Sequence, residues 1–461
     1  RIYCRSTPFA RCQQCSMELS NVYVRNIYSD FLKDKADILL CSLALEPLTS
    51  IRRNPSKIEQ GRFREIFGED VVEWCEDGVY LPERPSFTHD PLFHSGTYYV
   101  QEAGSMFVGH IVKHLLKDLD QDLTVLDLCA APGGKSTDLL SVLPKSSLLV
   151  ANEVIKSRCP ILAENVAKWG YSNVVVTNND PRDFSKLTSL FDIVVVDAPC
   201  SGEGMFRKDS EAIEQWSEDN VELCVARQKR ILADVWPSLK KGGYLLYSTC
   251  TFNSHENDDN VEWIINELGA EIVEIPSFES ILRTNMSGYQ FAPGLTKSEG
   301  FFVAVLRKVS SDGETIKFKS QKGSVKSDVS INYLNDNYLY KLKGEIVKAY
   351  PMDLYQRMIN IESLLHSVHS GIAVATQKGK DFIPQADLAL AIDFKRGLFP
   401  EVELSKEDAI KFLSKENLLF RDAPLGFLLL TYLSQPLGFV KNLGNRSNNL
   451  HPMARRIRNV Q

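Results

Sequence analysis

The sequence lacks any long hydrophobic run. Although 44% of its 461 residues are hydrophobic, no apolar stretch reaches the roughly 18–20 residues that a membrane-spanning helix needs. The first residues also lack the charged start, apolar block and cleavage site of a secretory signal. These absences argue against a membrane protein, and we expect a cytoplasmic one.

An excess of positive charge is also missing. The chain has 53 Lys and Arg against 59 Asp and Glu, for a formal net charge of −6. Any contact with nucleic acid is therefore expected from local patches. One candidate patch is the end of the chain, which has no acidic residue but contains Lys441, Arg446, Arg455, Arg456 and Arg458. Such a run predicts either a solvated tail or a phosphate-contacting face.

The ten cysteines lack the spacing of a disulfide framework or a metal site. Seven are scattered singly among apolar or loop segments, which favours a reducing compartment. The other three, Cys4, Cys12 and Cys15, include one CxxC, but no second CxxC or HxxxH supplies the remaining ligands of a zinc site. We therefore expect no metal. The chain begins with Arg1 instead of Met, and we expect residues 1–20 to be the unstructured end of an incomplete open reading frame.

The length predicts several domains, and the sequence contains no internal repeat. Strand-like apolar runs at 125–128, 147–152, 174–177, 191–196, 243–248 and 300–306 alternate with helical spacing at 135–143, 156–169 and 219–239. This alternation predicts parallel βαβ units and a doubly wound α/β sheet. The predicted segments are 1–20 (unmatched), 21–100 (N-terminal region), 101–308 (catalytic domain), 309–328 (linker), 329–395 (small α+β module) and 396–461 (final domain, with Ser405 capping a helix).

A turn of small residues follows the first predicted strand, at the edge of the sheet where open α/β folds bind ligands. A phosphate-binding P-loop is the nearest rival, because Gly134-Lys135-Ser136 matches its end. Cys129, however, stands where that motif needs its first Gly, and Pro132 lacks an N–H. The turn therefore predicts a nucleoside pocket formed by Cys129, Ala130, Ala131, Pro132, Gly133, Gly134 and Lys135.

Acidic residues follow the next two strands. Glu153 lies where such folds bind ribose hydroxyls, and Asp180 could hold the exocyclic amine of adenine. Each also has an ordinary interpretation, Glu153 as a carboxylate at a helix start and Asp180 as a turn residue. Their order at successive strand ends favours the pocket.

Two cysteines end the fourth and fifth strands, in Asp197-Ala198-Pro199-Cys200 and Thr249-Cys250. A single Cys is most often a small buried hydrophobe, but two in adjacent polar loops predict reactive thiols that face one crevice. C5 of cytosine is too weak a nucleophile to attack a methylsulfonium directly. Addition of a thiolate to C6 makes C5 electron-rich, and a carboxyl group near N3 can steady the developing charge. The sequence offers the thiol, the carboxyl group and the adjacent donor pocket.

Three motifs together resemble the RNA cytosine-C5 methyltransferase family (the Nol/Nop/Sun group), and most closely its RsmF-like branch, which modifies small-subunit ribosomal RNA. They are CAAPGGK (129–135), DAPCSGEGMFRK (197–208) and YSTCTFNSHEN (247–257), within a resemblance that covers about residues 40–461. The resemblance implies a Rossmann-like methyltransferase sheet that uses S-adenosyl-L-methionine, an N-terminal α+β region that binds RNA, and a C-terminal PUA-like RNA-binding module.

The resemblance also implies roles for particular residues. Residues 129–135, Glu153, Asp180 and Asp197 would contact the donor, and Cys250 would be the nucleophile. Cys200 would assist release of the product, and Asp197 would also lie beside the pyrimidine. The implied partner is structured RNA, 16S rRNA or the small ribosomal subunit, and not DNA, because both Pro199-Cys200 and Thr249-Cys250 are present.

Other interpretations stay open at this point. Tyr98, Tyr99 and the loop 205–208 are candidates for holding the base, with core or rim packing as the alternative. The substrate could also be tRNA, or the protein could be an inactive RNA-binding assembly factor. A cysteine hydrolase would need a base near Cys250, for which His255 is the nearby candidate.

Overall fold

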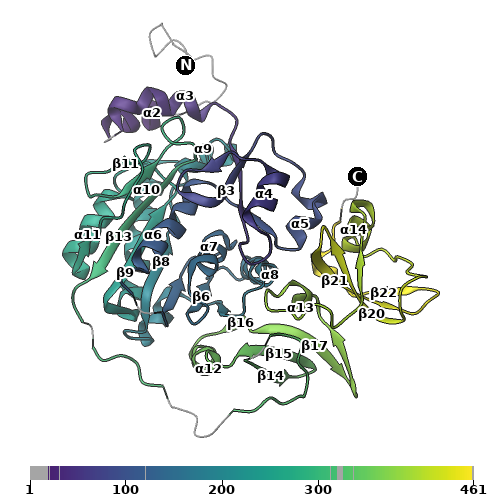
Figure 1. The fold of residues 1–461 in the computed structure, drawn as a ribbon. Coiled ribbons are helices and arrows are strands. Elements are labelled where there is room, and N and C mark those ends of the chain that lie inside the picture. The colour runs from purple at the N-terminus through teal and green to yellow at the C-terminus, as the bar shows by residue number, and fades with distance from the viewer. Residues whose placement is uncertain are drawn as a thin grey trace.

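The structure is a computed structural model that describes residue 19 and residues 21–30, 32–119, 121–311, 313–318, 325–335 and 337–458. The predictions for Cys4, Cys12 and Cys15 lie outside these residues. Figure 1 shows a central sheet with the N-terminal region above it and two C-terminal modules at its lower edge and side. No helix in the described part of the chain combines the length and apolarity needed to cross a bilayer.

The central sheet confirms the predicted α/β fold. Its parallel core runs in the order β8-β5-β6-β7, with β9 parallel to β8 on the other side. Each strand coincides with a predicted apolar run: β5 (Thr124–Asp127), β6 (Leu148–Asn152), β7 (Val174–Thr177), β8 (Phe191–Asp197) and β9 (Leu239–Thr249). The carboxyl ends of these strands therefore meet along one edge, where the predicted site residues lie.

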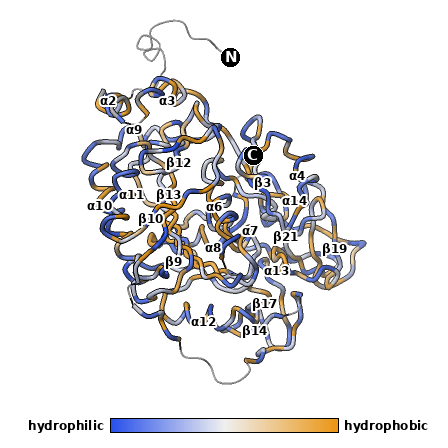
Figure 2. Tube along the Cα trace, turned by 60° about the vertical axis from the view of Figure 1, so that its left-hand side comes forward, coloured by the Kyte–Doolittle hydropathy of each residue, from blue (hydrophilic) through white to orange (hydrophobic). Residues whose placement is uncertain are grey.

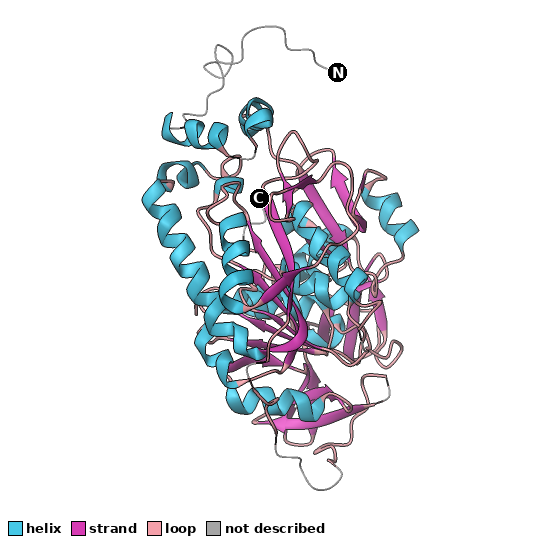
Figure 3. Cartoon of the chain, turned by 90° about the vertical axis from the view of Figure 1, so that its left-hand side faces the viewer, coloured by secondary structure: helices cyan, strands magenta, loops and turns pink. Residues whose placement is uncertain are grey.

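Helices cover both faces of this sheet, as its two-sided burial requires. Val125 faces a core shared with α6 (Phe107–Leu115), α7 (Gly134–Val142) and α8 (Cys159–Trp169). Its neighbour Leu126 faces the opposite core, shared with α10 (Glu218–Val235), α11 (Asp258–Leu268) and α12 (Tyr355–Leu364). Figure 2 shows the resulting hydrophobic interior, and Figure 3 shows the helices flanking the strands.

The two outer edges of the sheet add antiparallel strands to the predicted parallel units. The predicted strand at 300–306 is β13 (Phe301–Lys308), which runs antiparallel to β9 and continues into further antiparallel strands. These are β10 (Ala270–Ile272), β11 (Leu282–Arg283) and β12 (Tyr289–Phe291). At the far edge, β16 (Ser367–Ser370) pairs antiparallel with β7. A strand from the predicted small module thus completes the catalytic sheet.

The N-terminal region forms a four-stranded sheet in the order β2-β3-β1-β4. Two helices, α2 and α3, precede this sheet and pack against the loops that follow β8 and β9, because Tyr23 and Leu39 share a core with Phe206 and Phe252. The elements are α2 (Asn21–Ser29), α3 (Ala36–Leu43), β1 (Thr49–Arg53), α4 (Gln60–Phe67), β2 (Val71–Val72), β3 (Cys75–Leu81), α5 (Pro91–His94) and β4 (Tyr98–Val100).

Two further four-stranded sheets form the C-terminal part. The first contains β14 (Tyr338–Lys343), β15 (Ile346–Pro351), β17 (Ile372–Lys378) and β18 (Asp381–Pro384), followed by α13 (Ala386–Leu390). The second contains β19 (Glu401–Glu403), β20 (Gly426–Tyr432), β21 (Gln435–Asn442) and β22 (Ser447–Asn449), with α14 (Lys406–Leu413). The Ser405 hydroxyl accepts from Asp408 N at 3.1 Å, which confirms the predicted cap of α14.

Candidate active site

The small-residue turn connects β5 to α7. Gly133 has a φ of 116°, a left-handed conformation that favours glycine, and α7 begins at the next residue. The first N–H groups of a helix have no partner within the helix. The turn therefore presents free donors and the positive end of the helix dipole at the carboxyl edge of the sheet.

A cavity of about 200 Å³ lies beside this turn. One wall comes from the catalytic domain, and the other comes from β4 and the residues after it. The first wall contains Cys129, Ala130, Ala131, Pro132, Gly134, Lys135 and Asp197, and the second contains Tyr99, Val100, Gln101, Glu102 and Ser105. The predicted turn residues thus line a real cavity, except for Gly133, which is not among its lining residues.

The carboxyl group of Asp127 is buried at the end of β5, before the turn. Its Oδ2 accepts from Ser136 Oγ at 2.6 Å, but its buried Oδ1 has no partner among the described residues. Burial raises the pKa of Asp127 to about 7. Asp127 is 0% exposed and does not line the cavity. The fit to S-adenosylmethionine therefore rests on the small residues of the turn, which let a ligand approach the backbone, and on the free N–H groups at the start of α7.

Glu153 and Asp180 lie after β6 and β7, as predicted, but outside this cavity. Glu153 is 3% exposed, and its Oε1 accepts from Ile155 N at 2.8 Å. Asp180 Oδ1 accepts from Arg182 N at 3.2 Å and so caps the following turn. Asp180 is therefore the N-cap of a short 3-10 helix, whereas Glu153 holds a turn ahead of α8, whose N-cap is Arg158. Their contacts to the donor stay predictions.

The two predicted thiols lie side by side. Cys250 follows β9 and Cys200 follows β8, and their Sγ atoms are 3.0 Å apart. Both cysteines are free thiols. The hydrogen bond with Cys250, followed by burial, raises the pKa of Cys200 well above its usual value. Cys200 is therefore a protonated thiol at neutral pH, placed to donate to the sulfur of Cys250.

Asp197 lies at the end of β8, three residues before Cys200, and lines the cavity. Its Oδ2 accepts from Lys135 Nζ and its Oδ1 accepts from Ser248 Oγ, each at 2.8 Å. Burial opposes the charge of Lys135, but the ion pair with Asp197 outweighs it and raises the pKa of that ammonium. This geometry follows from the parallel pairing of Asp197 with Ser248 in β8 and β9. The sequence therefore brings together one carboxylate, one ammonium and two thiols.

Two buried glutamates that the sequence interpretation missed hold the cysteine loops. Glu256 is 0% exposed and accepts from Ser201 N at 3.1 Å, from Gln228 Nε2 at 2.6 Å and from Asn253 Nδ2 at 2.9 Å. Thus a residue after Cys250 fixes the backbone directly after Cys200.

Glu203 performs the converse task. Its Oε2 accepts from Phe252 N at 2.7 Å and from Asn253 N at 3.2 Å. A residue after Cys200 therefore fixes the backbone after Cys250. In the sequence each glutamate resembles an ordinary loop residue, because only the folded chain brings the two loops together.

Several candidates for holding the base are packed instead. The hydroxyl of Tyr98 donates to Asp90 Oδ2 at 2.6 Å in the interior. Phe206 is 2% exposed, and Arg207 Nε donates to Glu299 Oε2 at 2.8 Å. The packing interpretation is therefore the correct one for these three, whereas Tyr99 lines the cavity.

His255, the candidate base of a cysteine hydrolase, lies at the surface. Its side chain is 71% exposed, and its Nδ1 lies 2.9 Å from Asp259 Oδ2. The imidazole is therefore engaged at the start of α11, which gives a hydrolase little support. Within the described ranges, no group of three or more His, Cys, Asp and Glu is arranged to hold a metal ion.

The basic end of the chain is partly packed and partly exposed, and whether its exposed residues contact phosphate stays a prediction. Arg455 NH1 donates to Asp387 Oδ1 at 2.7 Å and so attaches the tail to α13. Lys441, Arg446, Arg456 and Arg458 are exposed.

Comparisons with known proteins identify the family of this chain. Family profiles match residues 21–103 (N-terminal domain of 16S rRNA methyltransferase RsmF), 114–307 (16S rRNA methyltransferase RsmB/F) and 399–457 (methyltransferase RsmF PUA domain). Two similar proteins, from Shewanella loihica and Salmonella agona, carry the name ribosomal RNA small subunit methyltransferase F. Each is 31% identical to this chain; the first match covers 93% of this chain and 94% of the relative, the second 87% and 89%.

Solved structures agree at the level of the fold. A methyltransferase homolog protein from Pyrococcus horikoshii has a TM-score of 0.56 at 24% identity, covering 66% of this chain and 98% of that one. NSun6 from the same organism, solved with SFG, has a TM-score of 0.55 at 21% identity, covering 63% and 99%. From these matches and the geometry above, the chain belongs to the ribosomal RNA small subunit methyltransferase F family.

Proposed function

We propose that this protein methylates C5 of a cytosine in 16S rRNA through a covalent bond between Cys250 Sγ and C6 of the base. The observation that carries the proposal is the pair of sulfurs 3.0 Å apart, next to an Asp197–Lys135 ion pair that lines the donor cavity. The names of the relatives support ribosomal RNA of the small subunit as the substrate.

S-adenosylmethionine, the methyl donor of this methyltransferase fold, supplies an electrophilic methyl group when bound. Its proposed contacts are residues 129–135, Glu153, Asp180 and Asp197. The cavity that most of the turn lines supports the first of these contacts, and the positions of Glu153 and Asp180 at neighbouring strand ends support the others.

The protein side of the reaction begins with the thiolate of Cys250. Attack on C6 forms a carbon–sulfur bond and moves electron density through the ring to C5 and N3. The carboxyl group of Asp197 lines the donor cavity, where it can hold a proton near N3. After C5 has gained the methyl group, transfer of the C5 proton to a water molecule reforms the C5–C6 double bond of the ring and expels the Cys250 thiolate. Cys200, held protonated, can give its proton to that leaving sulfur.

Release of tritium from RNA labelled at C5 of cytosine tests the proposal. Cys250→Ala is expected to abolish release, because no adduct forms. Cys200→Ala is expected to accumulate a protein–RNA adduct that survives denaturing electrophoresis, because expulsion of the thiolate slows. Cys224→Ala is the matched control, since Cys224 lies buried in α10, and it should release tritium at the normal rate. Normal turnover in Cys250→Ala would refute the mechanism.

The position and substrate are tested separately from the mechanism. Bisulfite mapping of ribosomal RNA from cells with and without the gene should show one or more small-subunit cytidines that lose their methyl group. An altered pattern confined to tRNA would instead assign the enzyme to tRNA, and an unchanged pattern in both would favour an RNA-binding assembly factor.

A further inference from the structure

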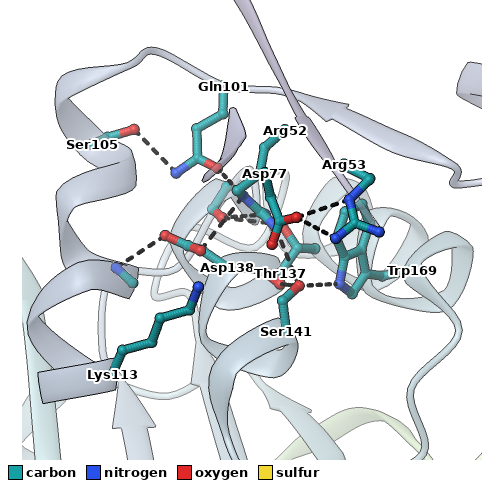
Figure 4. A network of polar contacts seen from close by, with 12 residues as sticks. Arg52, Arg53, Asp77, Gln101, Ser105, Lys113, Thr137, Asp138, Ser141 and Trp169 are labelled. Carbon is teal, nitrogen blue, oxygen red and sulfur yellow. Dashed lines mark hydrogen bonds and ion pairs between the residues drawn. The ribbon is translucent and has the colours of Figure 1, made fainter. Parts of the chain in front are cut away.

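The donor cavity has two walls that come from different parts of the chain, and one buried side chain touches both. Gln101, after β4, and Gly134, at the start of α7, each line the cavity. Arg52 of β1 lies behind them and is 1% exposed. Figure 4 shows its guanidinium between Gln101 on one side and α7 on the other.

The guanidinium uses its donors on both walls. Arg52 Nε donates to Gln101 Oε1 at 2.7 Å. On the side of α7, NH2 donates to Thr137 Oγ1 at 2.7 Å and to the carbonyl of Gly134 at 3.3 Å. NH1 donates to Ser141 Oγ, one turn further along the helix, at 3.2 Å. A planar group with five N–H donors can make these contacts at once, whereas a single ammonium cannot.

The charge of Arg52 is balanced within the same contact. Arg52 Nε lies 3.6 Å from Asp138 Oδ1, and this carboxyl group is 4% exposed. The guanidinium also lies over the ring of Trp169, 4.8 Å from its centroid. A buried ion is retained only where its partners compensate the loss of water. Here all of these partners connect the N-terminal region to the first turns of α7 and to α8.

We propose that Arg52 is a positioning residue for the methyl-donor site, which sets the separation between the Gln101 wall and the Gly134 wall. The N-terminal region then has a second role besides any contact with RNA, because it completes the donor cavity. This role concerns donor binding alone. It does not depend on which base is methylated.

Arg52→Lys tests this role while keeping a positive charge for Asp138. The ammonium cannot reach Gln101, Thr137 and Gly134 together, so the walls lose their common anchor. We expect the Kd for S-adenosylmethionine, measured by calorimetry on the RNA-free protein, to rise roughly tenfold or more. In steady state the KM for the donor should rise with it, while the KM for RNA changes less than twofold.

Arg53→Lys is the matched control. Arg53 is the next residue of β1 and points the other way, where Nε donates to Asp77 Oδ1 at 2.8 Å and NH1 donates to the Ile58 carbonyl at 2.6 Å. This substitution also disturbs a partly buried ion pair of the same strand, but it touches neither wall. Its Kd for the donor should stay within twofold of the wild-type value.

Thr137→Val is a second, milder probe in case Arg52→Lys folds poorly. It removes only the hydroxyl that accepts from Arg52 and donates to the Gly134 carbonyl at 3.0 Å. The Kd of Thr137→Val for S-adenosylmethionine should also rise, but by a smaller factor than that of Arg52→Lys. The inference is overturned if folded Arg52→Lys or Thr137→Val binds the donor as tightly as wild type, or if Arg53→Lys weakens binding equally.

Discussion

At the scale of single residues, the surroundings of Cys200 determine whether its thiol is protonated. Cys200 accepts from the backbone N–H of Cys250 at 3.4 Å and shares a contact with its sulfur. The contact with Cys250 and burial both raise the pKa of Cys200. One thiol is thereby kept protonated, as a group that assists expulsion must be, beside the thiol that is proposed to attack.

Glu256 gives a residue-scale prediction. Glu256→Gln keeps the shape but places an NH2 group among donors from Ser201, Gln228 and Asn253. At least one buried donor then loses its acceptor, which costs about 1–3 kcal/mol. We expect kcat to fall at least roughly tenfold, because the loop of Cys200 shifts, while the donor Kd stays unchanged. Glu222→Gln, an exposed change on α10, should alter neither quantity. A normal kcat in Glu256→Gln would show that the Cys200 loop keeps its position without the Glu256 carboxylate.

The elements show which parts of the fold the sequence could predict. The strands β5 to β9 were predictable because each is a short apolar run buried on both faces. β16 was not, because Ser-Val-His-Ser has no such run and its pairing with β7 joins segments almost two hundred residues apart. The reversed direction of β13 was also hidden, since an apolar run has no direction.

The attachment of the small module to the catalytic sheet gives an element-scale prediction. Met358 of α12 is 0% exposed and shares a core with Leu126 and Val175. Met358→Ala should therefore destabilise the catalytic domain by about 2–5 kcal/mol, measured by urea unfolding with tryptophan fluorescence. Met352→Ala, at a site 50% exposed, should change stability by less than about 0.5 kcal/mol. If the two substitutions behave alike, the module does not support the sheet.

At the scale of the whole molecule, the candidate site was predictable where its residues are local in sequence. The three motifs supply the donor turn, Asp197 and both thiols. Arg52, Glu203 and Glu256 could not be assigned, because most of their partners are distant in the chain and a charged residue is usually solvated. The sequence also could not show that Arg455 pairs with Asp387 and so attaches the basic end of the chain to α13.

The same tail makes the molecule sensitive to acid. His451 is 6% exposed, its Nε2 lies 3.2 Å from the carbonyl of Arg455, and burial lowers its pKa from 6.5 to about 4. Between these values the unfolded chain binds a proton that the folded chain does not. The stability that depends on neutral His451 is thus fully present above pH 6.5 and is lost as the pH falls toward 4.

His451→Gln should make the stability of the protein depend less on pH. Calorimetric melting of the wild-type protein should show the melting temperature falling between pH 6.5 and 4.5, with a total effect on stability of at most about 3 kcal/mol. In His451→Gln the group that titrates is gone, so the shift over this window should be smaller, although the variant starts less stable at pH 7. His255→Gln, at the 71% exposed position, should retain the wild-type slope. An equal acid shift in all three proteins would mean that other groups, and not the buried imidazole beneath the basic tail, set the acid limit of the molecule.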